Sequence, residues 1–249
     1  MIILNAGVPR SGTVLVNAII RELLLGVAPS IIQANPHGAE LGQFLRRVEE
    51  KGQHLYATSL IHTHTWGTDV GNRVRGATHI KAIVNYRDPR DVCVSLMTLH
   101  ENEFDVTCKA IEQYFALMEA CVRDTCALVL PYELMAANPD AAIFQIGRHL
   151  GLWPGLDTIS RIARATSIDT HRTVMEQVQA GTRKKLAHRK NRKRVLVEDK
   201  ETLINDRHIQ SGSAGRWKTE LTVEQQQMAT ERFAPILKRY GYSDHGGTD

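Results

Sequence analysis

The segment Leu4-Asn5-Ala6-Gly7-Val8-Pro9-Arg10-Ser11-Gly12-Thr13 decides the fold, because it joins two apolar stretches of different length. Residues 1–4 predict a short buried strand, and residues 14–25 predict a helix with apolar residues on most faces. A glycine-bounded turn between a strand and a helix points backbone N–H groups and the positive helix end at a phosphate. The sequence therefore predicts a phosphate-binding loop directly after the first strand.

The spacing of Gly7 and Gly12 matches the two glycines of the P-loop, G-x-x-x-x-G-K-[ST]. The next position breaks that motif, because Thr13 stands where the P-loop has its lysine. Arg10 is the only cation in the loop and precedes Gly12 by two residues. This displaced charge argues against ordinary nucleotide hydrolysis.

Two segments together resemble a known family. Residues 8–13 resemble the 5′-phosphosulfate loop, P-[KR]-S-G-T, of sulfotransferases that use 3′-phosphoadenosine 5′-phosphosulfate (PAPS). Residues 85–96, Asn-Tyr-Arg-Asp-Pro-Arg-Asp-Val-Cys-Val-Ser-Leu, resemble the 3′-phosphate segment of the same family, R-[DN]-P-[RK]-D-x-x-x-S. A planar guanidinium can hold such a phosphate with two hydrogen bonds. By this resemblance Arg87 and Ser95 bind the 3′-phosphate, while Asp91 supports Arg87 or caps the helix.

A third segment, residues 209–218, resembles the family's R-K-G-x-x-G-x-W-K stretch, which forms a lid over the cofactor. Gln210 and Ser211 replace the Arg-Lys pair of that stretch. Leu15 and Ile168 stand where cytosolic members have aromatic residues against the adenine. The resemblance implies that PAPS, and its product PAP, contact Arg10, Ser11, Gly12, Thr13, Val14, Leu15, Arg87, Ser95, Tyr132, Thr166, Ile168, Gln210, Ser211 and Gly212.

The candidate general base follows the third predicted strand. Residues 60–65, Leu-Ile-His-Thr-His-Thr, resemble the K-T-H-L of cytosolic sulfotransferases, which places the catalytic histidine at His64 and an assisting group at His62. A neutral imidazole suits this work, because its unperturbed pKa is about 6.5. Glu40 is the competing base, since sulfotransferases that act on sugars and protein tyrosines use a glutamate that follows the loop. Arg10 is the residue expected to stabilise the leaving phosphate.

The composition limits which class of protein this chain can belong to. The chain has 249 residues, of which 43% are hydrophobic and 23% charged, as is ordinary for a globular domain. It holds no apolar run of the roughly 20 residues that a membrane span needs. The four cysteines form no C-x-x-C pair, so we expect reduced thiols and no metal site. The start of the chain shows no signal segment, which predicts a cytoplasmic protein without membrane partners.

Residues 183–194 carry eight lysines and arginines and no acid, although the net charge of the chain is only +4. Such a run invites a nucleic-acid interpretation, yet it has no interleaved aromatic residues for stacking on bases. We interpret residues 183–194 as a solvated, mobile basic segment beside the lid, and we expect no nucleic-acid partner.

Apolar runs at residues 1–4, 30–34, 55–63, 79–86 and 126–131 alternate with helical patterns. This alternation predicts a single α/β domain over residues 1–249, with a five-stranded parallel sheet flanked by helices, as in P-loop nucleotide kinases. Ligands of such sheets bind beyond the carboxyl ends of the strands. The segments after Gly7, Ile61 and Tyr86 are therefore expected to converge.

The sequence as a whole predicts a sulfotransferase that moves a sulfuryl group in line from PAPS to an acceptor hydroxyl or amine, with a general base and no metal. Two alternatives stay open: a P-loop kinase-like nucleotide-binding protein, and a PAPS-binding module without turnover. The second alternative is motivated by the loss of the Arg-Lys pair at Gln210 and Ser211. The identity of the acceptor and the oligomeric state are left open.

Overall fold

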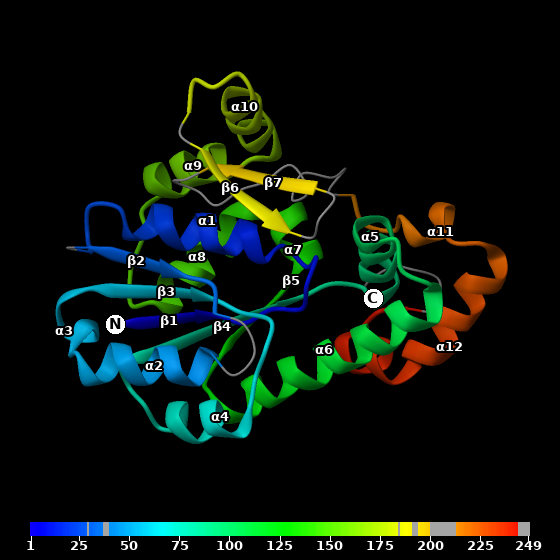
Figure 1. The fold of residues 1–249 in the computed structure, drawn as a ribbon, viewed down its shortest axis with the longest axis horizontal. Helices are drawn as coiled ribbons and strands as arrows, with labels where there is room; N and C mark the ends of the chain where they lie inside the picture. The colour runs from blue at the N-terminus through cyan, green and yellow to red at the C-terminus, as the bar shows by residue number, and fades with distance from the viewer. Residues whose placement is uncertain (29, 37–39, 184, 191–193, 200–212, 244–249) are drawn as a thin grey trace.

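Five parallel strands form the centre of the protein in the computed structural model (Figure 1), which describes the chain except residues 29, 37–39, 184, 191–193, 200–212 and 244–249. Their spatial order is β2-β3-β1-β4-β5. The strands are β1 (Ile2–Asn5), β2 (Ile31–Ala34), β3 (Thr58–His62), β4 (Ile80–Tyr86) and β5 (Leu128–Pro131). The predicted fold class is confirmed.

Helices cover both faces of this sheet, which explains why all four residues of the central strand β1 are buried. One core cluster packs between the sheet and α2, α4, α5, α6 and α12, and a second packs between the sheet and α1, α7, α8 and α9. The helices are α1 (Thr13–Leu24), α2 (Glu40–Glu50), α3 (Gln53–Tyr56), α4 (Thr68–Val74), α5 (Pro89–His100), α6 (Phe104–Asp124), α7 (Tyr132–Ala137), α8 (Pro139–His149), α9 (Leu156–Ala165), α10 (Ile168–Gln179), α11 (Trp217–Glu220) and α12 (Val223–Tyr240).

The carboxyl ends of three neighbouring strands bring the predicted site segments together. Asn5 at the end of β1 pairs with His62 at the end of β3 and with Ile83 in β4. The loop after β1, the loop after β3 and the start of α5 after β4 therefore emerge side by side at one edge of the sheet. From β1 the chain first adds β2 and β3 on one side of the sheet and then β4 and β5 on the other side. Ligands of such sheets bind where the two sides meet, beyond the carboxyl ends of the strands.

The extent of one predicted strand needs correction. The apolar run 55–63 is not one strand, because its first residues belong to the short helix α3 and the strand β3 begins at Thr58. Gly52 begins that helix with a left-handed φ of 61°, which turns the chain before the strand. Within the basic segment 183–194, residues 185–190 form β6 (Lys185–Lys190), which pairs antiparallel with β7 (Arg194–Asp199), a hairpin not predicted from the sequence. The mobility of the segment stays a prediction.

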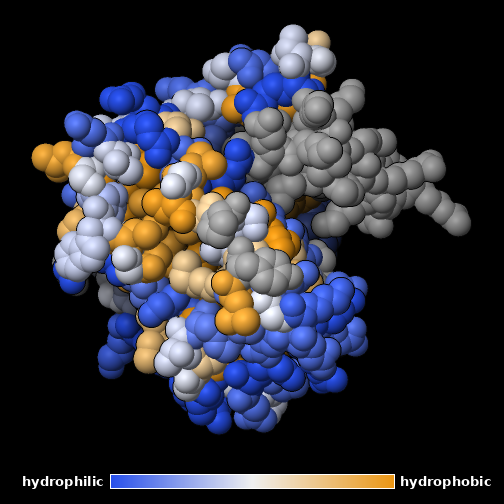
Figure 2. Space-filling model, turned by 90° about the vertical axis from the view of Figure 1, so that its left-hand side faces the viewer, coloured by the Kyte–Doolittle hydropathy of each residue, from blue (hydrophilic) through white to orange (hydrophobic). Residues whose placement is uncertain are grey.

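The end of the molecule away from the site carries exposed apolar side chains. Leu25 and Val27 follow α1, and Leu55 lies in α3; all three are exposed. Figure 2 looks at this end and shows an apolar area bordered by hydrophilic residues. None of the helices that the structure describes has the length and apolar character needed to cross a lipid bilayer. The cytoplasmic location stays a prediction.

Candidate functional site

The loop between β1 and α1 is fastened to the end of β4. The backbone N–H of Val8 donates to the Asn85 carbonyl at 2.9 Å, and Asn85 Nδ2 donates to the Ser11 carbonyl at 2.7 Å. Gly7 leaves room for this contact, because a Cβ there would lie 2.2 Å from Asn85 Oδ1. Gly12 has a φ of 89°, a left-handed conformation that glycine adopts without steric cost. Both glycines of the motif are thus required by the shape of the loop.

Ser11 contributes its side chain to the loop itself. It is fully buried, and its hydroxyl lies within hydrogen-bond distance of the Val8 and Asn85 carbonyl oxygens. Its backbone N–H also donates to the Val8 carbonyl, at 3.3 Å. The hydroxyl therefore holds the loop in shape, and direct contact between Ser11 and a cofactor stays a prediction.

Helix α1 starts at Thr13 with Gly12 as its N-cap, and no side chain caps it in the part of the chain described. The N–H groups of the first turn of a helix have no acceptor within the helix, so they are available to an anion. Thr13 is buried, Val14 packs against Met175 and Val178 of α10, and Leu15 packs against the second core cluster.

Arg10 reaches from this loop to the helix that follows β4. Its φ of 66° is left-handed, which costs a residue with a side chain roughly 1–2 kcal/mol. Its Nε donates to Ser95 Oγ of α5 at 2.8 Å. Burial, together with the positive charges of Arg87 and Arg216, lowers the pKa of Arg10 to about 10. Three guanidinium groups therefore act on one small region of the site.

Arg87 is held from two sides. It is 5% exposed, its Nη2 donates to Asp91 Oδ2 at 3.1 Å, and its guanidinium lies 4.5 Å from the centre of the Tyr132 ring. The same Asp91 accepts the backbone N–H of Gly215 at 2.8 Å and that of Trp217 at 3.1 Å. The predicted supporting role of Asp91 is confirmed. The carboxylate also ties the end of the predicted lid to the Arg87 segment.

These groups fit a ligand with phosphate groups at two positions. The buried Nε of Arg87 has no hydrogen-bond partner among the described residues, and a buried guanidinium donor normally has one. The uncapped first turn of α1 offers a second set of donors beside Arg10. An anion at both places would satisfy these donors and offset the mutual repulsion of the arginines.

His64 is attached to the loop that carries Arg10. Its Nδ1 lies 2.6 Å from the carbonyl oxygen of Gly7. A carbonyl oxygen can only accept, so Nδ1 carries the proton and the lone pair of the neutral ring is on Nε2. The ring of His62 meets it edge to face, with 4.7 Å between the ring centres. The structure thus brings together both histidines predicted from the sequence.

Glu40, the competing base, is the first residue of α2, and its side chain is exposed. Residues 37–39, which connect it to the preceding strand, lie outside the described part of the chain. A carboxylate at this position also has a structural benefit, because it complements the positive end of the helix.

A small pocket opens beside His64, on the side of the sheet covered by α6. Its lining includes Trp66 and three α6 residues, Tyr114, Met118 and Cys121. Burial raises the pKa of the Cys121 thiol to about 12, so this cysteine is a neutral, weakly polar part of the wall at physiological pH. The cavity has a volume of about 10 Å³, which is room for roughly one water molecule, so the surrounding side chains must move to admit an acceptor.

The residues expected around the adenine are only partly described. Thr166 is buried, with its hydroxyl donating to the Ile162 carbonyl at 2.9 Å, and Ile168 begins α10 with 37% of its surface exposed. The predicted contacts Gln210, Ser211 and Gly212 lie outside the described residues. The adenine contacts therefore stay predictions.

Arg90 is a buried residue beside the site whose structural role was not recognised from the sequence. It is fully buried, forms a two-point ion pair with Asp88 (3.0 and 2.8 Å), and lies 4.0 Å from the centre of the Trp217 ring. Its Nη2 also donates to the carbonyl of Ser243 at 2.9 Å. Arg90 thus joins the start of α5 to α11 and to the chain after α12. The R-D-P-R pattern alone does not tell which arginine faces a ligand.

Comparisons with known proteins agree with this geometry. The family described as the sulfotransferase domain matches residues 2–241. No curated protein sequence matches the chain.

Solved structures resemble the fold at low sequence identity. A crystal structure of mouse sulfotransferase SULT7A1 complexed with PAP is 16% identical, has a TM-score of 0.65, and matches over 95% of this chain and 84% of its own. Retinol dehydratase in complex with androsterone and PAP is 16% identical, with a TM-score of 0.63 over 95% and 80% of the two chains. Retinol dehydratase with retinol and PAP has a TM-score of 0.60 at 16% identity, over 95% and 81%.

Proposed function

The chain belongs to the sulfotransferase family, and we propose that Arg10, Arg87 and His64 carry out its PAPS-dependent transfer of a sulfuryl group to an acceptor hydroxyl. The observation that supports these roles most strongly is the meeting of the three residues at the ends of adjacent strands. Arg10 follows β1, Arg87 follows β4, and His64 follows β3.

The cofactor supplies a sulfuryl group whose transfer leaves negative charge on the 5′-phosphate oxygen, as in phosphoryl transfer. The first-turn N–H groups of α1 and the guanidinium of Arg10 stabilise this charge. Arg87 and Ser95 bind the 3′-phosphate, which distinguishes this donor from ATP. The hydrogen bond from Arg10 Nε to Ser95 Oγ at 2.8 Å supports a site in which the residues that bind the two phosphates contact each other.

His64 acts as the general base. Its Nδ1 is bonded to the Gly7 carbonyl, so Nε2 accepts the proton of the acceptor hydroxyl. As that proton leaves, the acceptor oxygen forms its bond to sulfur and the bond between sulfur and the 5′-phosphate oxygen breaks. The products are a sulfate ester and PAP. His62, in ring contact with His64, orients or assists it.

The side chains around the small cavity beside His64 favour an apolar alcohol or phenol as the acceptor, which would enter as these side chains move apart. Its walls include the Trp66, Tyr114 and Met118 side chains. A sugar or a charged peptide would leave polar groups without partners against these walls. A primary amine would have to enter in its neutral form to act as the nucleophile, so amines are expected to react more slowly than hydroxyls.

A transfer assay tests the proposal. We expect [35S]PAPS with 2-naphthol, 1-hexanol, glucose and a tyrosine peptide as probe acceptors to label the apolar acceptors first. EDTA is expected to leave the rate unchanged, because Arg10 and backbone N–H groups meet the developing charge. Activity that disappears with EDTA and returns with magnesium would favour the kinase-like alternative. PAP binding without turnover of any acceptor would favour the binding-module alternative.

A further inference from the structure

We infer that Asp124, at the end of α6, is a positioning residue that holds the base His64 in place through the indole of Trp66. The inference rests on the proposed function, because it gives the base its orientation. Asp124 acts through Trp66, which lies in the segment after β3. The hydrogen bond between Trp66 and Asp124 joins residues that are 58 positions apart in the sequence.

His64 lies between two anchored residues. On one side, the buried Thr63 donates its backbone N–H to the Asn5 carbonyl at 3.0 Å, which continues the pairing of β3 with β1. Thr63 Oγ1 also accepts the backbone N–H of Thr65 at 3.1 Å, which closes a tight turn around His64. On the other side, Trp66 is 8% exposed and packs in the core under α6. These two anchors hold the chain on both sides of His64.

The Trp66 anchor depends on one carboxylate. Trp66 Nε1 donates to Asp124 Oδ2 at 3.0 Å, while Arg75 Nη2 donates to Asp124 Oδ1 at 2.7 Å. The hydrogen bonds from Arg75 and Trp66 hold the pKa of Asp124 below its usual value, so it is ionised and acts only as an acceptor at neutral pH. Asp124 thus fixes the indole with a charge-assisted hydrogen bond.

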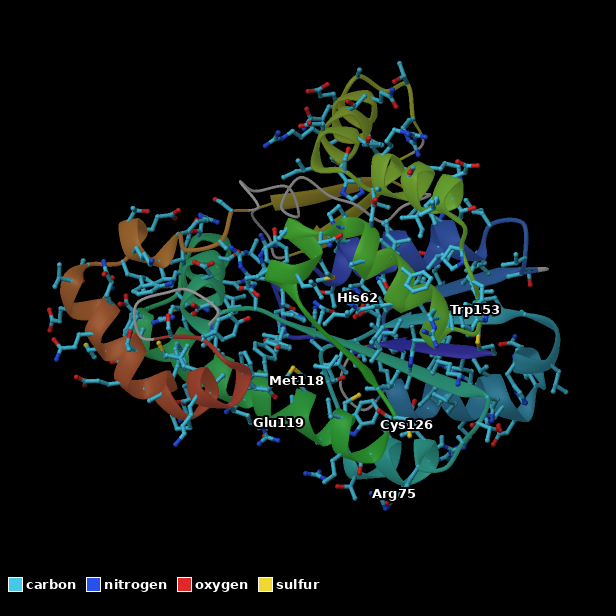
Figure 3. The ribbon with its side chains drawn as sticks, turned by 180° about the vertical axis from the view of Figure 1, so that it is seen from behind. His62, Arg75, Met118, Glu119, Cys126 and Trp153 are labelled. Carbon is cyan, nitrogen blue, oxygen red and sulfur yellow. The ribbon has the colours of Figure 1, made fainter. Side chains whose placement is uncertain are left out.

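The contact between Asp124 and Trp66 leaves no room for a side chain at Gly71. A Cβ on Gly71 of α4 would lie 2.2 Å from Asp124 Oδ2 and 3.5 Å from Trp66 Nε1. Glycine at this position lets the carboxylate and the indole meet directly over the helix. Arg75 belongs to the same side of the molecule, where Figure 3 shows it below α6 and Met118. Three elements, α4, α6 and the segment after β3, therefore converge on one hydrogen bond.

Small displacements of a base matter, because a misplacement of about 1 Å can cost up to ~10²-fold in rate. If Trp66 moves, the segment that carries His64 moves with it, and the bond from His64 Nδ1 to the Gly7 carbonyl would be lost. The imidazole can then exchange tautomers and present N–H instead of a lone pair to the acceptor. Loss of the Asp124 contact would thus lower kcat without changing the groups that bind the cofactor.

The experiment compares two substitutions of Asp124. Asp124→Asn keeps an oxygen that can accept from Trp66, whereas Asp124→Leu keeps the branched shape with larger methyl groups in place of the oxygens and removes the acceptor. We expect Asp124→Leu to lower kcat with 2-naphthol, or with the fastest acceptor in the transfer assay, by tenfold or more, and Asp124→Asn to stay within about threefold of wild type. PAP affinity by calorimetry is expected to stay within twofold in both variants.

Trp66→Phe removes the donor from the other side of the contact. It is expected to lower kcat as Asp124→Leu does, and the double variant Trp66→Phe/Asp124→Leu is expected to be no slower than the slower single variant. Trp153→Phe is the matched control, because Trp153 is 71% exposed and packs on Arg148 by the other face of the sheet. It is expected to keep the wild-type kcat.

A spectroscopic readout separates this inference from the proposed function. In 15N-histidine spectra, we expect wild-type His64 to show one tautomer with the proton on Nδ1, and Asp124→Leu to show exchange between tautomers. The His64 signals are identified by their loss in His64→Asn. Wild-type kcat in folded Asp124→Leu, an unchanged tautomer, or equal losses in Asp124→Asn and Asp124→Leu would each overturn the inference. Full activity of His64→Ala would instead overturn the assignment of His64 as the base. The tautomer experiment would still test whether Asp124 holds the His64 ring in place.

Discussion

Arg10 Nε donates a hydrogen bond to Ser95 Oγ at 2.8 Å, which joins the loop after β1 to the helix after β4. In the proposed mechanism the interaction of Arg10 with the cofactor is strongest in the transition state, when charge develops on the 5′-phosphate oxygen. We therefore expect Arg10→Ala to lower kcat by ~10²-fold or more while PAP affinity falls less than tenfold. Transfer kinetics and PAP titration measure the two effects. Equal losses in kcat and in PAP affinity would contradict this role for Arg10.

Arg87 is expected to select nucleotides that carry a 3′-phosphate. Removing a charge-assisted hydrogen bond costs about 1.5–3 kcal/mol, so Arg87→Ala is expected to weaken PAP binding by tenfold or more and to change ADP binding little. Asp91 keeps its two backbone donors in this variant, so the fold is expected to survive. Arg161→Ala, at a half-exposed ion pair with Glu22, is the control. Equal affinity of the wild-type protein for ADP and PAP would contradict the prediction.

Arg90 is expected to matter for stability. Its ion pair with Asp88 is buried, and breaking such a pair by removing one partner costs about 3–5 kcal/mol. Urea denaturation of Arg90→Ala is expected to show a loss of this size in the free energy of unfolding. Arg172→Ala, at the exposed pair with Asp169, is expected to lose less than about 1 kcal/mol. Similar losses in both variants would show that Arg90 has no special structural role.

The local features of this fold could be predicted from the sequence. Asp88 caps α5 before Pro89 at its first position, and Thr222 forms a capping box with Gln225, as such patterns predict. The alternation of strands and helices gave the sheet, and the family motifs pointed to the loop and to Arg87. These signals lie within a few residues of one another, so a single sequence displays them.

The long-range contacts could not be predicted in this way. The burial of Arg90 depends on Trp217, which lies far along the chain and covers its guanidinium. The bond between Trp66 and Asp124 likewise leaves no local pattern. The hairpin of β6 and β7 was missed, because the dense positive charge of residues 183–194 obscured the strand pattern.

The cysteines are expected to differ in reactivity. The thiolate is the reactive form, and burial raises the pKa of Cys121 to about 12, so only about one Cys121 in 10⁴ is ionised at pH 8. Because the pKa is raised, Cys121 gains reactivity only as the pH approaches that value. Cys126 is exposed. Iodoacetamide at pH 8 is expected to label Cys126 first, and all four cysteines in urea, as read by peptide mass spectrometry. Equally fast labelling of Cys121 in the native protein would contradict its burial.

In the proposed mechanism His64, with its Nδ1 bonded to the Gly7 carbonyl, is the base of sulfuryl transfer. The most direct test measures kcat of His64→Ala and Glu40→Gln side by side at saturating [35S]PAPS and acceptor. We predict that His64→Ala loses ~10²–10⁴-fold in kcat with nearly unchanged PAP affinity, while Glu40→Gln stays close to wild type. An inactive Glu40→Gln beside a His64→Ala that keeps most of its kcat would contradict the account.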